Sequence, residues 1–129
     1  MAEKNEKVVK TEKALAKKLK KEKDKIIIEG DLVDKVIKIK ATGRAAWIIA
    51  IGAIGVALVA IYTLPATAGF SAIANVVAGT AAASVLGLST AVSATTIAFF
   101  AGGVSALDTL RDYEIASRSD DRLTLVRKN

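Results

Sequence analysis

The pattern of apolar and polar positions divides the chain into a charged start, a long uncharged middle and a charged end. From residue 45 to residue 107, a stretch of 63 residues contains no Asp, Glu, Lys or Arg. A helix of about 20 apolar residues crosses the hydrocarbon core of a bilayer. The pattern therefore predicts an all-α membrane protein built as a helical transmembrane hairpin, and three crossings are the alternative.

We expect the two spans at about residues 45–64 and 86–107. The first span places Trp47 and Tyr62 near the two membrane interfaces, as an aromatic belt requires. The intervening stretch, 65–85, is rich in Ala, Gly, Ser and Thr. This composition predicts a small-residue connection between the spans.

Two helices are predicted before the first span. Residues 1–30 form a Lys/Glu-rich arm, in which residues 2–25 are expected to be a basic helix that is partly frayed. Residues 31–43 place apolar and charged side chains on opposite sides of a helical wheel, which predicts an amphipathic helix on lipid headgroups. The competing interpretation is a β-hairpin that pairs 26–29 with the alternating residues 37–40.

The tail, residues 108–129, predicts a short β-hairpin. Its apolar positions alternate, with Tyr113 and Ile115 before a polar run and Leu123 and Leu125 after it. An isolated two-stranded hairpin is only marginally stable in water. We therefore expect this hairpin to pack on the N-terminal segment or on its copy in another subunit.

Composition matters mainly for the functions that it excludes. The chain has no Cys and no His, which excludes disulfides, thiol nucleophiles, imidazole bases and Cys/His metal sites. The uncharged stretch also lacks the carboxylate that catalysis within a membrane would need. We therefore expect a protein that is not an enzyme and that binds neither a cofactor nor a metal.

The net charge of +6 lies entirely in the first 44 residues, which contain 14 Lys and Arg against 8 Asp and Glu. Residues 108–129 contain five of each sign. Since positive residues flank both ends of the uncharged stretch, the positive-inside rule predicts a multi-pass protein of the inner membrane with both termini in the cytoplasm.

Anionic lipid headgroups are the partner that the basic residues favour. Nucleic acid is disfavoured, because no Arg or aromatic residue interleaves the lysines of the arm. The expected lipid contacts are Lys17, Lys18, Lys20, Lys21, Lys35, Lys38, Lys40 and Arg44.

Small residues recur with a period of 3.5 on both expected spans, a spacing that lets two helix backbones approach closely. Such seams predict packing within the hairpin or, in a homo-oligomer, between subunits. The seam residues are Ala46, Ala50, Ala53, Ala57 and Ala60 on the first span, and Ala91, Ala94, Ala98, Ala101 and Ser105 on the second. Gly52 and Gly55 add a second small-residue patch on the first span.

Three hydroxyl residues, Ser89, Ser93 and Thr96, share one face of the second expected span. Hydroxyls in membrane helices usually bond to the backbone one turn earlier. The alternative is that these three residues line a pore formed by several copies.

Three functions are compatible with these features. The first is a small integral membrane protein that self-assembles through its small-residue seams and permeabilises or remodels the membrane. In layout, with a short chain, a spanning hairpin and charged ends, the sequence is similar to holins, which implies a pore-forming, holin-like or effector-like role. The second is a membrane anchor or scaffold whose cytoplasmic ends bind a partner protein. The third is a membrane-tethered binder of anionic lipid or nucleic acid through the Lys-rich arm.

Overall fold

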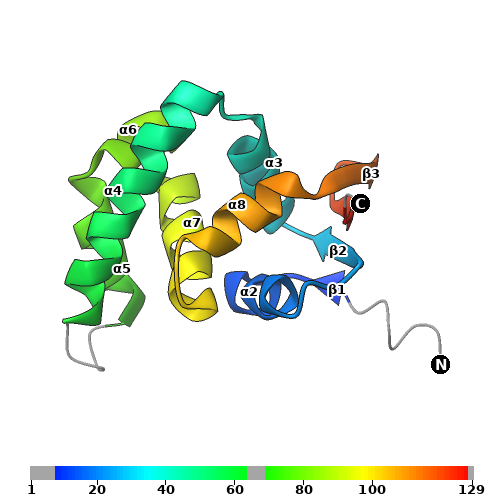
Figure 1. The fold of residues 1–129 in the computed structure, drawn as a ribbon, viewed down its shortest axis with the longest axis horizontal. Coiled ribbons are helices and arrows are strands. Elements are labelled where there is room, and N and C mark those ends of the chain that lie inside the picture. Colours follow the sequence, from blue (N-terminus) through cyan, green and yellow to red (C-terminus); the bar gives the residue numbers. More distant parts are fainter. Residues whose placement is uncertain (1–7, 64–68, 128–129) are drawn as a thin grey trace.

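The computed structural model describes residues 8–63 and 69–127, and this part of the chain folds as a mixed sheet with helices packed on one side of it (Figure 1). In chain order, the described elements are β1 (Val8–Val9), α2 (Glu12–Lys20), β2 (Lys25–Glu29), α3 (Leu32–Ala41), α4 (Arg44–Tyr62), α5 (Gly69–Ala78), α6 (Ala81–Leu86), α7 (Leu88–Ala101), α8 (Ser105–Asp112), β3 (Glu114–Arg118) and β4 (Arg122–Val126).

The two ends of the chain build the sheet together, in the strand order β1-β2-β4-β3. Strand β1 runs parallel to β2 and is joined to it through α2, whereas β2–β4 and β4–β3 are antiparallel pairs. The C-terminal hairpin thus packs on the N-terminal segment. A run of β-branched residues, Ile26, Ile27 and Ile28, favours the extended strand at the centre of this sheet.

The face that the central strands β2 and β4 turn toward the helices is apolar. On this face Ile26 pairs with Leu125, and Ile28 pairs with Leu123. All four side chains are buried. Helices α2, α3 and α8 lie between this face and α7 (Figure 1).

Helix α7 is the centre of the helical part, because it contacts every other described helix. Its inward positions are small: Ala91, Ala94 and Ala98 are fully buried. Side chains of this size let neighbouring helices approach closely, and burial from several sides explains why α7 carries no charged residue.

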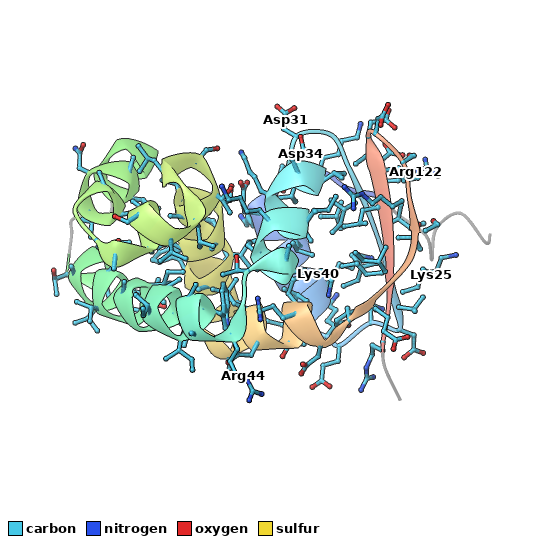
Figure 2. The ribbon with its side chains drawn as sticks, turned by 90° about the horizontal axis from the view of Figure 1, so that it is seen from above. Lys25, Asp31, Asp34, Lys40, Arg44 and Arg122 are labelled. Carbon is cyan, nitrogen blue, oxygen red and sulfur yellow. The ribbon has the colours of Figure 1, made fainter. Side chains whose placement is uncertain are left out.

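Helices α4 to α7 form the end of the molecule away from the sheet (Figure 1). We call residues 45–101 of these helices the uncharged lobe, because their sequence contains no Asp, Glu, Lys or Arg. We call the sheet with α2, α3 and α8 the charged half. Figure 2 shows the labelled charged residues in the charged half and, for Arg44, at its border with the lobe.

The prediction of an all-α transmembrane hairpin is wrong, since the chain forms a mixed α/β fold of the kind found in soluble proteins. The expected second span, 86–107, is not one helix. Gly87 and Gly102 adopt φ values of +83° and +91°, and they bound α7. Helix α8 then turns by 109° from α7 and continues to Asp112.

Among the described helices, α4 alone is long and apolar enough to cross a bilayer, and α7 with α8 would count only as one sharply bent span. Lack of charge predicted membrane spans because a helix buried within a protein has the same composition as one buried in lipid.

Three other local expectations differ from the structure. The connection 65–85 contains α5 and α6, with its residues 65–68 outside the described part. The single helix at 2–25 is replaced by β1 and the shorter α2, and residues 2–7 also lie outside the described part. Residues 37–40 belong to α3, so β2 takes β4 as its partner instead.

Candidate functional site

The most unusual surface is the outward side of α4. After Arg44 its exposed side chains are all apolar or aromatic, and Val56 and Val59 are 71% and 67% exposed. Only 33% of the most apolar 18-residue stretch of α4 is buried, whereas a core helix of a soluble protein is mostly buried. An apolar patch of this kind usually marks an interaction site. We call it the α4 face; its residues are Ile48, Ile49, Val56, Val59 and Tyr62.

The rest of the lobe surface is also free of charge. On the described parts of α5 and α6 and on the turn between them, the exposed positions include Asn75, Gly79, Ala81 and Ser84. A protein surface in water commonly contains about a quarter to a third charged residues. The lobe therefore differs from an ordinary solvated surface over several helices and not only on α4.

Two cations join α3 and α8 at the border of the lobe. Arg111, on α8, donates hydrogen bonds to the carbonyl oxygens of Ile39 and Thr42, at 2.6 and 2.9 Å. Lys40, on α3, donates in return to the carbonyls of Leu110 and Arg111, at 3.2 and 3.0 Å. Each helix thus supplies the cation that satisfies the last carbonyls of the other helix. Figure 2 shows Lys40 between these two helices.

Trp47 connects this junction to α4. Its indole Nε1 donates to Asp108 Oδ1 at 3.0 Å, and the guanidinium carbon of Arg111 lies 4.6 Å from its ring centroid. A pocket of about 460 Å³ opens beside it. The pocket is lined by Arg44, Trp47, Ile48, Asp108, Arg111 and Asp112. Since Ile48 also belongs to the α4 face, the pocket and this face are continuous.

The sequence pattern missed Asp108 and Arg111 as members of this junction. They are the first charged residues after the uncharged stretch, and their i, i+3 spacing puts them on one side of a helix. This spacing was the available signal, but nothing in the sequence pairs α8 with Trp47.

The basic residues expected to contact lipid do not form one surface. Lys17, Lys20 and Lys21 line a shallow depression of about 360 Å³ on α2. Lys18 is on the same helix, Lys35 and Lys38 are on α3, and Arg44 begins α4. Lys40 is engaged in the junction with α8.

The alanines of the two predicted seams lie mainly inside the molecule. On α4, Ala50 and Ala57 are buried, Ala46, Ala53 and Gly55 are half-buried, and Gly52 and Ala60 are exposed. On the second expected span, Ala91, Ala94 and Ala98 are buried, Ala101 ends α7 and Ser105 begins α8. The buried alanines belong to the same core of the single chain.

The three hydroxyl residues are placed differently from one another. Ser93 is buried and donates to Glu12 Oε2, at 2.6 Å, where α2 packs on α7. Thr96 is buried and donates to the carbonyl of Val92, at 2.8 Å. Ser89 is exposed at the first turn of α7, beside α3.

The buried phenol of Tyr113 makes the folding stability depend on pH in the alkaline range. Burial raises the pKa of its phenol above the ordinary value of 10.0, and the hydroxyl donates to the carbonyl of Lys23. Above pH 10.0 the unfolded chain releases this proton first, so stability falls as pH rises through the folded-state pKa. Burial lowers the pKa of Lys40 below 10.5, so the folded chain releases this proton before the unfolded chain does. This raises stability as pH approaches 10.5, and it partly offsets the loss of stability caused by Tyr113.

We expect Tyr113→Phe to lose less stability than the wild type when pH is raised from about 8 to about 11, because only the wild type ionises here. At pH 8 the variant should be about 1 kcal/mol less stable, since it lacks one hydrogen bond. Urea unfolding at both pH values measures this difference. Parallel losses in the two proteins would contradict it.

Among the described residues, no group of three or more Asp or Glu is placed to hold a metal ion. No family model matches the sequence, and neither a curated protein nor a solved structure shows a significant match to it. The assignment of function therefore rests on the surface chemistry of the molecule itself.

Proposed function

We propose that this protein binds to the surface of lipid bilayers through the uncharged lobe, with the α4 face in the interfacial layer. The observation that carries this proposal is a 19-residue helix with an exposed apolar side on a lobe without charged residues. A peripheral protein binds a bilayer by burying apolar area to the depth of the headgroup and acyl boundary.

The energy available from this face is sufficient for reversible binding. Each large apolar side chain that leaves water contributes on the order of 1 kcal/mol, at about 25 cal/mol for each Å² buried. The residues with most to gain are Ile48, Ile49, Val56 and Val59, because all four are more than half exposed. Arg44, at the start of α4, can keep its guanidinium in the headgroup layer while its stem contacts apolar surface.

Self-association through the same face is the second candidate. Gly52 and Gly55 lie on α4, and no heavy atom of another described element lies within 4 Å of the position of an added Cβ. A second helix could therefore approach this part of α4 closely. Permeabilisation or remodelling of the membrane would need such assembly on the bilayer, and it stays a prediction.

A charge placed on the α4 face should release the protein from membranes. We expect Val56→Glu with Val59→Glu to lower vesicle binding at least about tenfold, because an ionised carboxylate strongly disfavours an apolar layer. Flotation of the purified full chain with vesicles of phosphatidylcholine and phosphatidylglycerol measures it. The control is Ile115→Glu, which introduces one carboxylate at an apolar residue that is 42% exposed in the charged half, and Val56→Glu alone is the single-charge variant to compare with it.

Equal flotation of the double variant and the wild type would contradict the proposal. A wild type that does not float would also contradict it. If this wild type is a dimer in light scattering and the double variant is a monomer, the result favours the second candidate. Vesicles of phosphatidylcholine alone, compared with the mixture, measure how much the lysines contribute through anionic headgroups.

A further inference from the structure

We infer that the basic side of α2 binds anionic lipid headgroups and extends the membrane contact of the α4 face past the end of α7. We call this surface the α2 face; its residues are Lys13, Lys17, Lys20 and Lys21. The inference rests on the proposed binding to bilayers, and it adds the class of lipid that the protein selects.

Helix α2 separates its side chains into an apolar and a basic side. Leu15, Ala16 and Leu19 are buried, and α2 packs closely on α7. The four lysines of the α2 face lie on the opposite side of the helix, and all four are exposed. The depression of about 360 Å³ on this side is lined by three of these lysines and by no acidic residue. The α2 face therefore presents positive charge of one sign to its surroundings.

The acidic residues nearest to these lysines in the chain are held by other partners. Glu12 accepts a hydrogen bond from Ser93, at 2.6 Å, on the side of α2 that packs on α7. Glu22 and Asp24 form ion pairs with Arg127, at 3.5 and 3.6 Å. None of the four lysines is in an ion pair with another residue that the structure describes. Their charge is therefore not compensated within the described part of the chain.

The charge pattern of the α2 face is complementary to an anionic bilayer. Lys17 lies four residues after Lys13 and four residues before Lys21, a spacing at which like charges on a helix repel each other. The negative potential of a bilayer that contains anionic lipid offsets this repulsion and attracts each lysine near the surface. Such a bilayer thus stabilises an arrangement that is unfavourable in water.

A row of aromatic side chains connects the α2 face to the α4 face. The ring of Tyr62, at the end of the α4 face, stacks on Phe99 with 5.3 Å between the ring centroids, and Phe99 meets Phe100 edge to face at the same distance. The Nζ atom of Lys13 lies 5.5 Å from the centroid of the Phe100 ring. In Figure 1 the end of α4, the end of α7 and helix α2 lie along the lower side of the molecule. The two faces are therefore parts of one continuous surface.

This combination of residues favours lipid over nucleic acid. Tyrosine rings are enriched at the level of lipid headgroups, and lysine stems lie on apolar surface while their ammonium groups stay in the headgroup layer. A surface that binds single-stranded nucleic acid usually combines its basic residues with aromatic rings on which bases stack. Helix α2 contains neither an aromatic residue nor an Arg.

Flotation of the full chain with vesicles of phosphatidylcholine and an increasing fraction of phosphatidylglycerol tests the α2 face. We expect the affinity of the wild type to rise with the anionic fraction and to fall when salt is raised from about 50 to about 500 mM, because salt screens exposed charges. Lys17→Gln with Lys20→Gln should lower the affinity for the anionic vesicles about 20-fold, since each lysine near such a surface contributes a factor of about five.

The matched control is Lys35→Gln with Lys38→Gln, which removes the same net charge from α3. It should float nearly like the wild type, and thermal unfolding of each variant shows that it is folded. If the two double variants float alike, or if the wild type floats equally well with phosphatidylcholine alone, the α2 face does not bind anionic lipid.

The inference and the proposed function fail separately. If only Val56→Glu with Val59→Glu releases the protein, the α4 face binds the bilayer and the inference is wrong. If only Lys17→Gln with Lys20→Gln does so, the α2 face binds anionic lipid and the proposed role of the α4 face is wrong. Fluorescence anisotropy with a labelled oligonucleotide examines the other class of partner. Oligonucleotide binding that the two lysine substitutions abolish, without any dependence of flotation on phosphatidylglycerol, would overturn the inference in favour of nucleic acid.

Discussion

Replacing Trp47 by alanine is expected to lower the free energy of unfolding by about 3–5 kcal/mol, the usual range for a large aromatic residue removed from a core. Trp47 is buried at the border of the lobe and the charged half. The substitution removes its apolar contacts, the hydrogen bond to Asp108 and the surface on which Arg111 stacks. It should therefore loosen the attachment of α4 to α8.

Urea unfolding followed by circular dichroism measures this loss, because the tryptophan fluorescence disappears with the only Trp in the chain. Trp47→Phe is the matched control: it keeps an aromatic ring for Arg111 but cannot donate to Asp108. We expect the control to be clearly more stable than the alanine variant. A loss below about 1 kcal/mol in Trp47→Ala would show that this junction contributes little to stability.

The second large effect is expected from Lys40→Met, at about 1–3 kcal/mol. Methionine keeps much of the apolar stem but leaves the carbonyls of Leu110, Arg111 and Tyr113 without their donor. These groups are half-buried at the end of α8, so water replaces the ammonium only in part. The same substitution at Lys20, which is exposed on α2, is the control and should change stability by less than about 0.5 kcal/mol.

A double-mutant cycle with Arg111→Met shows whether the two cations act as one unit. Arg111 lies close enough to lower the pKa of Lys40, an effect that comes second to burial. Removing either cation therefore relieves repulsion on the other while it breaks hydrogen bonds. We expect the two losses to be non-additive. Strict additivity would contradict the reciprocal arrangement.

Elements with a strong local pattern were predictable from the sequence. The first expected span, 45–64, corresponds to α4 at Arg44–Tyr62, and the amphipathic helix at 31–43 corresponds to α3 at Leu32–Ala41. The alternation in the tail also predicted the two strands β3 and β4. The first of these was predictable from the length of its uncharged run, and the other two from the spacing of their apolar residues, although residues 37–40 also fitted a competing hairpin.

What the sequence did not reveal depends on contacts between distant residues. The pairing of Ile28 with Leu123 has no local signal, and without it the three isoleucines of β2 remain a short apolar run. The α4 face was placed in lipid or against another helix, because apolar residues in both surroundings look alike. Gly87 ends α6 and begins α7, although the sequence indicated it only as a candidate interruption of a span.

The sheet that joins both ends of the chain also sets the order of events during synthesis. Strand β2 cannot complete its pairing until β4 has left the ribosome, because Ile28 pairs with a residue 95 positions later in the chain. At about 5–20 residues per second, the lobe helices emerge several seconds before this partner strand exists. During that interval the edge of β2 that later pairs with β4 is unpaired, and it is open to a chaperone that the finished sheet no longer admits.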